Sequence, residues 1–229
     1  MKLFAVLKTL TAAERRLWLG SVLAILTSAV LSGAADPLSL TASLIGVTAL
    51  IFVAKGAVLG QLLTVVFAVF YGVISLQQRY YGEMITYLGM TAPMAVLAVI
   101  SWVRHPYRDS GEVRVSRITP PQMALVWLLA AVTTAVFYFI LRALGNASLG
   151  FSTLSVTTSF LASALTFLRS PYYALGYAAN DLVLIVLWTV AAAQQPSCFA
   201  MVVCFAAFLV NDLYGFYNWR RMQRRQQAA

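Results

Sequence analysis

The stretch that decides the fold is NDLYGFYNW, from Asn211 to Trp219, which closes a long apolar segment and runs directly into two arginines. Asn211, Tyr214 and Asn218 are three and four residues apart, so they share one face of a helix. Polar side chains in hydrocarbon are costly unless a partner satisfies them. The stripe therefore indicates either a polar ligand held inside a membrane bundle or hydrogen bonds that join helices.

The rest of the chain is strongly apolar. Of its 229 residues, 61% are hydrophobic and 10% are charged, and the mean hydropathy is +0.82. Because soluble domains carry about a quarter charged residues, we expect an integral membrane protein. The two cysteines, Cys198 and Cys204, lie six residues apart on different faces of one apolar segment, which is typical of neither a disulfide framework nor a metal site. We predict no cofactor.

Eight apolar segments are candidates for membrane-spanning helices. They cover residues 17–35, 38–54, 58–76, 84–103, 121–143, 152–168, 172–193 and 197–218. With the N-terminus inside, fourteen of the sixteen Lys and Arg residues, Lys2 and Lys8 among them, fall on the cytoplasmic side. Only Arg79 and Arg142 then fall outside, which is a strong positive-inside bias. The bias predicts a multi-pass protein of a bacterial inner membrane with both termini in the cytoplasm, and it leaves no reason to expect a nucleic-acid partner.

The second to fourth segments can be superposed on the sixth to eighth. The first helix of each set ends in a cation, Lys55 or Arg169, and the third ends with a tryptophan, Trp102 or Trp219, close to an arginine. Both sets run from outside to inside, so they form a parallel repeat that needs an odd helix between its halves. We predict an all-α membrane protein of eight transmembrane helices, with an N-terminal extra helix and two parallel three-helix bundles joined by a linker helix. The expected divisions are 1–37 (lead-in and extra helix), 38–103 (first bundle), 104–148 (cytoplasmic loop and linker helix), 149–219 (second bundle) and 220–229 (basic tail).

The seventh segment carries a second polar and aromatic stripe. It consists of Tyr173, Tyr177, Asn180, Asp181 and Trp188. At 1.5 Å per residue, Asn180 and Asp181 lie roughly 17 Å from the inner charged edge and Asn211 roughly 14 Å, near the middle of a core about 30 Å thick. An ionisable residue at this depth indicates a functional site. The alternative for Asp181 is a structural acid bonded to a neighbouring Tyr or Asn.

Aromatic rings beside amides suit a flat heterocycle joined to a sugar, because rings stack on rings and amides bond ring edges or hydroxyls. Tyr71 belongs to a similar face of the third segment. Two midplane acids are too few for the acidic rings of a cation channel. The sequence has no nucleophile, base and orienting group in one place, so we predict no enzyme. With no relay of acids leading to either side, we also expect transport without ion coupling.

These features resemble the Pnu-type vitamin and nucleoside transporters, the family of PnuC and its relatives. The motifs that carry the resemblance are Tyr81-Gly82-Glu83-Met84, Pro93-Met94 followed by Trp102, Asn180, and the set Asn211, Tyr214, Gly215 and Trp219. The resemblance covers nearly the whole chain after the first segment. It implies a SWEET-like 3+1+3 topology, facilitated uptake of a vitamin or nucleoside, trapping by a cytoplasmic kinase that phosphorylates the product, and Met94 as a site residue.

Two segments depart from the family pattern. Nicotinamide riboside members carry Trp-x-x-Trp-x-x-x-Asn in the seventh segment, where this chain has Tyr173, Gly176 and Asn180. The Gln and Trp that follow Pro-Met in the fourth segment are replaced by Ala95 and Val99. The substrate therefore stays open: nicotinamide riboside is the first expectation, a deoxynucleoside the second, and thiamine and riboflavin follow.

The sequence thus predicts a nucleoside-like small molecule, the lipid bilayer and a trapping kinase as partners, and it leaves homo-oligomerisation open. A membrane scaffold, whose polar stripes only join helices, is the alternative of another class. The predicted substrate-binding residues are Tyr71, Met94, Tyr173, Tyr177, Asn180, Asp181, Trp188, Asn211, Tyr214 and Asn218.

Overall fold

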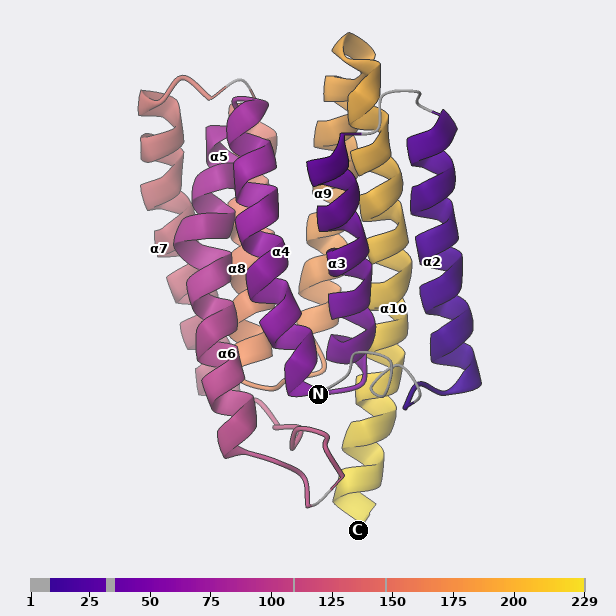
Figure 1. Ribbon diagram of the computed structural model, residues 1–229. Coiled ribbons are helices and arrows are strands. Elements are labelled where there is room, and N and C mark those ends of the chain that lie inside the picture. Colours follow the sequence, from indigo (N-terminus) through magenta and orange to yellow (C-terminus); the bar gives the residue numbers. More distant parts are fainter. Residues whose placement is uncertain (1–8, 32–35, 109, 147, 229) are drawn as a thin grey trace.

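A computed structural model describes residues 9–31, 36–108, 110–146 and 148–228. The first cations, Lys2 and Lys8, and the end of the first predicted segment lie outside these ranges. Within them the secondary structure is helical, apart from one isolated β-bridge between Pro106 and Val113, as predicted (Figure 1). The helices are α2 (Ala12–Leu31), α3 (Pro37–Ala54), α4 (Val58–Gln77), α5 (Tyr81–Ile85), the π-helix η1 (Thr86–Thr91), α6 (Ala92–Arg104), α7 (Pro120–Ala143), α8 (Leu149–Phe167), α9 (Tyr173–Gln194), the 3-10 helix η2 (Pro196–Cys198) and α10 (Phe199–Ala228).

Among the described residues, seven helices or continuous helical runs are long and apolar enough to cross a membrane. They correspond to the second to eighth predicted segments, with α5, η1 and α6 forming one run. The first predicted segment, 17–35, corresponds to α2, which is not among the seven. Its first two turns carry Glu14, Arg15 and Arg16.

Successive long helices run in opposite directions, so their connections gather at two ends of the molecule (Figure 1). We call one the basic end. The helix ends and connections gathered there contain the cations Arg15, Arg16, Lys55, Arg104, Arg108, Arg114, Arg117, Arg169, Arg220, Arg221, Arg224 and Arg225. The opposite end carries Arg79 and Arg142. This segregation is the one that the positive-inside count predicted for the described residues.

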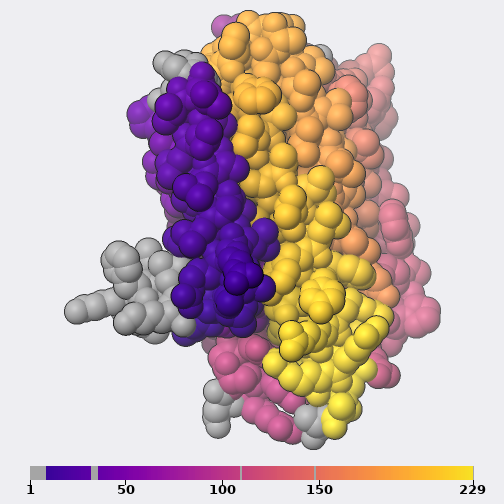
Figure 2. Space-filling view, turned by 90° about the vertical axis from the view of Figure 1, so that its right-hand side faces the viewer, coloured from indigo at the N-terminus to yellow at the C-terminus, as the bar shows by residue number. Residues whose placement is uncertain are grey.

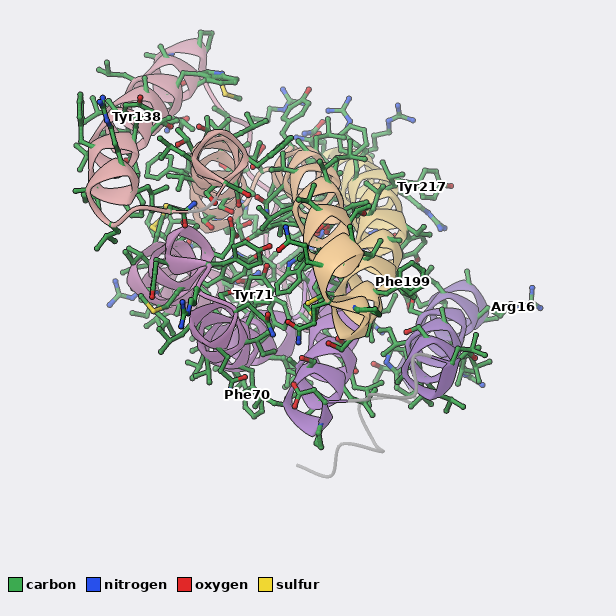
Figure 3. The ribbon with its side chains drawn as sticks, turned by 90° about the horizontal axis from the view of Figure 1, so that it is seen from above. Arg16, Phe70, Tyr71, Tyr138, Phe199 and Tyr217 are labelled. Atoms are coloured by element: carbon green, nitrogen blue, oxygen red, sulfur yellow. The ribbon has the colours of Figure 1, made fainter. Side chains whose placement is uncertain are left out.

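Six helical units form a closed ring. In order around it, α3 packs against α4, α4 against α6, α6 against α8, α8 against α9, α9 against α10, and α10 against α3. Viewed from above, Tyr71 points into the middle of this ring, whereas Tyr138 of α7 and Tyr217 of α10 lie at the periphery (Figure 3). Helix α7 packs on the outside against α8, and α2 lies along α10 and α3 (Figure 2).

The sequence Asp36-Pro37 starts α3 with a side-chain cap. The Asp36 carboxylate accepts hydrogen bonds from the Ser39 hydroxyl at 2.7 Å and from the backbone N–H groups of Ser39 and Leu38. Partial burial alone would raise the pKa of Asp36, but these hydrogen bonds outweigh it and lower the pKa below its ordinary value. The cap therefore stabilises the fold at neutral pH and weakens only as the pH falls through the acid range.

The last helix continues past its predicted end at residue 218. The sequence after Trp219 consists of good helix formers, and the predicted basic tail is helical to Ala228. This extension is held against the connection between α6 and α7. Gln226 accepts a hydrogen bond from Val115 N–H at 2.8 Å and donates one to the Val113 carbonyl at 3.1 Å.

Gly60 allows α4 to approach α3 closely. A Cβ at this position would lie 2.4 Å from the Val53 backbone nitrogen and 2.8 Å from the Phe52 carbonyl carbon, and backbone atoms cannot rotate away. We predict that Gly60→Ala lowers the free energy of unfolding by about 1–3 kcal/mol, the usual cost of overpacking. The matched control is Gly150→Ala in α8, where a Cβ would meet nothing within 4 Å. Melting curves in one detergent test this; equal melting temperatures for the two variants would contradict it.

Candidate functional site

A small cavity lies inside the ring, between α3, α4, η1, α9 and α10. It is lined by Gly46, Ala49, Leu50, Val53, Gln61, Thr64, Phe67, Tyr87, Thr91, Tyr177, Asn180, Asp181, Phe208 and Asp212. Its volume is about 40 Å³. That is enough for a few water molecules, whereas small-molecule pockets usually span about 300–1,000 Å³. The cavity, as it stands in this structure, is therefore too small to hold a molecule the size of a nucleoside.

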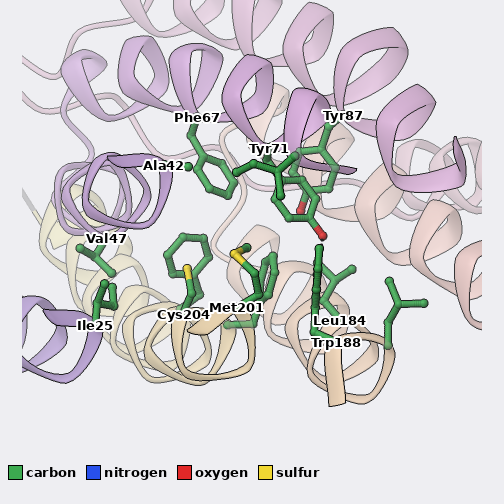
Figure 4. Packing of buried hydrophobic residues seen from close by; sticks show 14 of the residues in the cluster. Ile25, Ala42, Val47, Phe67, Tyr71, Tyr87, Leu184, Trp188, Met201 and Cys204 are labelled. Carbon is green, nitrogen blue, oxygen red and sulfur yellow. Dashed lines mark hydrogen bonds between the residues drawn. The ribbon is translucent and has the colours of Figure 1, made fainter. Parts of the chain in front are cut away.

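Aromatic side chains close the cavity toward the Arg79 end. The Tyr71 layer, as we call it, consists of Phe67, Tyr71, Tyr87, Trp188 and Phe205 (Figure 4). The rings of Tyr71 and Tyr87 are 4.3 Å apart between centroids, and Trp188 Nε1 donates a hydrogen bond to Tyr71 Oη at 2.8 Å. Tyr71 and Trp188, both predicted to contact substrate, are thus fully buried in this layer and do not line the cavity.

Two tryptophans close the cavity toward the basic end. Trp102 of α6 and Trp219 of α10 lie 5.3 Å apart between ring centroids. Trp102 Nε1 donates to the Thr166 carbonyl of α8 at 3.1 Å, and Trp219 Nε1 donates to the Val53 carbonyl of α3 at 2.8 Å. Each tryptophan therefore holds the first helix of the opposite set of three. We call this pair and its two hydrogen bonds the tryptophan latch.

The residues next to the latch repeat the same pattern. Ser101 Oγ donates to the Phe167 carbonyl at 3.0 Å, and Asn218 Nδ2 donates to the Ala54 carbonyl at 2.9 Å. Asn218, predicted to bind substrate, is therefore engaged with α3. Tyr173, another predicted site residue, packs on Trp219 with 4.8 Å between ring centroids and belongs to the latch region.

Asn180 is the polar centre of the cavity wall. Its Oδ1 accepts hydrogen bonds from Ser155, Thr158 and Ser159 of α8, at 3.1, 2.9 and 3.0 Å. Its Nδ2 donates to Tyr87 Oη at 3.5 Å, the longest of the four contacts. The carbonyl oxygen is thus fully used, while the amide N–H groups remain the part of Asn180 that a ligand can engage.

Glu83 is buried, although it lies between two predicted membrane segments, 58–76 and 84–103. Helix α5 begins at Tyr81 and buries Glu83 completely. Ser155 Oγ lies 3.1 Å from both Glu83 Oε2 and Asn180 Oδ1, so its one hydroxyl proton is donated to either acceptor in turn. Glu83 Oε1 has no partner among the described residues. Because Ser155 also bonds Asn180, a polar path leads from the cavity toward the Arg79 end.

Two carboxyl groups line the cavity. Asp181 on α9 and Asp212 on α10 are each 3% exposed and belong to the same lining. Asp181 Oδ2 receives no hydrogen bond from any described donor. Asp212 was not among the ten predicted contacts. Tyr177, Asn180 and Asp181 are the members of that set that line the cavity.

The stripe of Asn211, Tyr214 and Asn218 faces other helices. Asn211 Nδ2 donates to Ser21 Oγ of α2 and to the Ala207 carbonyl, both at 2.8 Å. Tyr214 Oη donates to Glu14 of α2 at 3.4 Å. The cavity side of α10 carries Phe208 and Asp212, spaced four residues apart and one residue out of phase with the stripe. The structure therefore places Asn211, Tyr214 and Asn218 outside the cavity lining, and half-buried Met94 on α6 is also absent from it.

A larger hollow of about 710 Å³ opens at the basic end. It is lined by His105, Pro106, Tyr107, Arg108, Arg114, Val115, Ser116, Arg117, Arg169, Gln223, Gln226 and Gln227. Burial lowers the pKa of Arg169 from its ordinary value, and the neighbouring charge of Arg114 lowers it further. A cationic ligand is repelled by such a surface, so the central cavity is the better candidate site for one.

Comparison with known proteins decides the family. The family model described as "Nicotinamide mononucleotide transporter" matches residues 36–221. The chain belongs to this transporter family. Since the match begins at residue 36, α2 lies outside it, whereas the ring, the cavity and the latch lie within it.

Relatives of known function agree with this assignment. The chain is 27% identical over 197 residues to the nicotinamide riboside transporter PnuC of Neisseria mucosa, covering 83% of this chain and 74% of that protein. It is 26% identical over 190 residues to the PnuC of Haemophilus influenzae, covering 82% and 81%. These relatives are transporters rather than enzymes, as predicted for this chain.

A solved structure has the same fold as this chain. The crystal structure of the vitamin B3 transporter PnuC superposes with a TM-score of 0.83 and covers 95% of this chain and 94% of its own, at 24% identity. Two cavity residues that the sequence did not single out, Gln61 and Thr91, lie inside otherwise apolar segments. A polar residue inside each predicted span was the signal that could have found them.

Proposed function

We propose that this protein carries nicotinamide riboside across the inner membrane of a bacterium by alternating access. The observation that carries the proposal is the central cavity, in which an amide, two carboxyl groups and aromatic rings meet in the middle of the helical ring. It is closed on one side by the Tyr71 layer and on the other by the tryptophan latch. The names of the family and of the two PnuC relatives support a pyridine nucleoside as the substrate.

The lining suits the three parts of nicotinamide riboside. Phe67, Tyr87 and Tyr177 offer ring faces and edges to the pyridinium ring. The amide N–H groups of Asn180 can bond the carboxamide or a ribose hydroxyl, as can the side chain of Gln61. The positive ring then lies near the carboxyl groups of Asp181 and Asp212. A deoxynucleoside lacks that positive charge and would leave the carboxyl groups without a counter-charge.

Transport requires the two closures to open in turn. The first bundle, within 38–103, would rock against the second, within 149–219, about the central cavity. Opening at the basic end breaks the two tryptophan hydrogen bonds, and opening at the other end separates the rings of the Tyr71 layer. Helix α7 would act as the linker that returns the chain to the opposite end.

The direction of uptake follows from the charges. We place the basic end in the cytoplasm by the positive-inside rule. A kinase there would phosphorylate the released nucleoside and so keep the cytoplasmic concentration of free nucleoside below the outside concentration. Reporter fusions test the topology: a fusion after Ala229 is expected to read cytoplasmic, and one inserted next to Arg79 is expected to read periplasmic. A periplasmic signal from the C-terminal fusion would contradict the eight-span arrangement.

Uptake into liposomes tests the function itself. The purified protein is expected to give saturable uptake of radiolabelled nicotinamide riboside that ends at equal concentrations at equal pH. An enclosed nicotinamide riboside kinase with ATP should turn equilibration into accumulation. Competition by deoxynucleosides, thiamine and riboflavin ranks the other substrates. Absence of uptake for all of these compounds would favour the alternative that the protein is a membrane scaffold.

A further inference from the structure

We propose that the hollow at the basic end binds a soluble phosphate monoester, and that an ester bound there keeps the tryptophan latch closed. The hollow lies between the α6–α7 connection, the turn after α8 and the end of α10. This site goes beyond the proposed function, because nicotinamide riboside carries no phosphate group. The effect on transport rests on the proposed function, whereas the binding of the ester does not.

The connection between α6 and α7 crosses the two turns next to the latch (Figure 1). Val113 N–H donates to the Gly56 carbonyl after α3, and Ser116 N–H donates to the Arg169 carbonyl after α8, both at 2.9 Å. Each of these turns lies within three residues of the carbonyl that accepts a tryptophan hydrogen bond. We call residues 113–116 the strap. A ligand that holds the strap in place therefore acts on both halves of the latch.

Arg169 is held in a fixed position beside the strap and the latch. Its Nη1 donates to Ser101 Oγ at 2.6 Å, and its Nε donates to the Arg114 carbonyl of the strap at 3.2 Å. Nη1 also lies 3.1 Å from His105 Nδ1. Ser101 directly precedes Trp102, so the guanidinium group of Arg169 joins the strap to one of the two latch tryptophans. A group fixed in this way is already placed for an anion before the anion arrives.

The positive charge of the hollow has no described carboxylate beside it. The ion pair found among the described residues joins Arg225 to Glu112, and neither of these two residues lines the hollow. The described lining holds no Asp or Glu, but it holds four arginines: Arg108, Arg114, Arg117 and Arg169. Like charges gathered in a partly buried hollow repel one another. A phosphate monoester, which carries nearly two negative charges at neutral pH, relieves this repulsion and accepts charge-assisted hydrogen bonds from guanidinium groups.

The size and position of the hollow suit a soluble ester better than a lipid headgroup. Its volume of about 710 Å³ is in the range of small-molecule pockets. One wall is the end of α10, where Gln226 lies seven residues, or roughly 10 Å, beyond Trp219 and past the apolar part of the helix. The Tyr107 ring and the glutamine amides offer partners to the nucleoside part of a mononucleotide. Nicotinamide mononucleotide, the product of the proposed trapping kinase, is an ester of this class.

A bound ester would slow transport. Opening at the basic end moves Trp102 and Trp219 away from the helices that they hold, and it separates Arg169 of the second bundle from Arg114 of the strap. An ester that contacts both arginines binds the closed form more tightly than the open form, so it shifts the population toward the closed form. The phosphorylated product would then reduce further uptake as it accumulates in the cytoplasm.

Calorimetric titration with nicotinamide mononucleotide tests the binding. Arg169→Gly and Arg114→Gln are each expected to raise the Kd of the ester about 10- to 150-fold, the usual effect of losing a charge-assisted hydrogen bond. Both variants should fold, because φ of +56° at residue 169 suits glycine and the Arg114 side chain is exposed. The matched control is Arg79→Gly at the opposite end, which removes the same charge at the same φ of +56° and should bind as wild type. Binding that is lost in Asn180→Ala but kept in Arg169→Gly would place the ester in the central cavity and refute the proposed site.

Uptake into liposomes tests the effect on the latch. The ester is added to both faces, so that the orientation of the protein in the bilayer does not matter. It is expected to lower the initial rate of nicotinamide riboside uptake several-fold for wild type and Arg79→Gly, and to leave the rates of Arg169→Gly and Arg114→Gln unchanged. Equal slowing of wild type and these two variants, or no slowing of wild type, would overturn the link between the hollow and the latch.

The lipid composition separates the two sources of phosphate. In phosphatidylcholine liposomes the ester should slow wild type, and adding phosphatidylglycerol should leave that effect in place. If phosphatidylglycerol alone slows wild type and abolishes the effect of the ester, a lipid headgroup occupies the hollow and the soluble ligand is wrong. Absence of nicotinamide riboside uptake by wild type would overturn the proposed function, while the calorimetric result for the ester would still decide the binding site.

Discussion

Asn180→Ala is expected to raise the Kd for nicotinamide riboside about five- to 150-fold, equivalent to about 1–3 kcal/mol for a buried polar partner left unsatisfied. The substitution removes the amide N–H groups that the substrate can reach, and it deprives Ser159 of its hydrogen-bond acceptor. Calorimetric titration of the purified variant measures the Kd, and melting curves measure the accompanying loss of stability. An unchanged Kd would mean that the cavity is not the binding site.

Asn211→Ala is the matched control for this experiment. Asn211 has the same side chain on the adjacent helix α10, but its amide bonds Ser21 of α2 and the Ala207 carbonyl. We expect a lower melting temperature with a nearly unchanged Kd, because α2 loses a contact while the cavity keeps its lining. Equal losses of affinity in the two variants would contradict the separation between the cavity and the α2 contact.

Trp219→Ala is expected to lower the free energy of unfolding by about 3–5 kcal/mol, the usual range for truncating a large buried aromatic side chain. Trp219 is fully buried, donates a hydrogen bond to the Val53 carbonyl and packs on Trp102 and Tyr173. Trp127→Ala in α7 is the control, since that side chain is 56% exposed on the outside of the bundle. Chemical or thermal unfolding in one detergent compares the two.

The latch also predicts coupling between its two tryptophans. Because the rings of Trp102 and Trp219 are in contact, the effects of Trp102→Ala and Trp219→Ala should not add in the double variant. The expected interaction energy is about 0.5–3 kcal/mol. Additive effects would show that each tryptophan acts alone and would remove the reason for treating them as one closure.

The helices could be predicted from local signals in the sequence. Charges and breakers such as Lys55-Gly56 and Asp36-Pro37 bound the apolar runs, and the tryptophans at 102 and 219 mark equivalent positions in the two sets of helices. The α9 stripe could be predicted because a carboxyl group at mid-membrane is costly to expose to lipid and is therefore expected to face the interior of the bundle.

The cavity side of α10 could not be predicted in the same way. Asn211 and Asp212 are both polar, and they point about 100° apart on the helix. Which one faces the ring depends on where α2 packs, and α2 lies 190 residues away in sequence at the Ser21 contact. Glu83 is a similar case, because the start of α5 depends on Gly82 N–H donating to Asn146 Oδ1, 64 residues away.

The π-helix η1 is a point at which the fourth membrane segment can change its helical pitch and rotate about its axis. A π turn holds one residue more than an α turn, and η1 leaves the hydroxyls of Thr86 and Thr91 without partners among the described residues. If η1 relaxed to α geometry, the part of the helix beyond it would turn by about 100° and advance about 1.5 Å. Trp102 would then swing off Trp219, while Tyr87 at the start of the turn could stay against Tyr71. A local change of pitch in η1 would thus open the tryptophan latch and leave the Tyr71 layer closed.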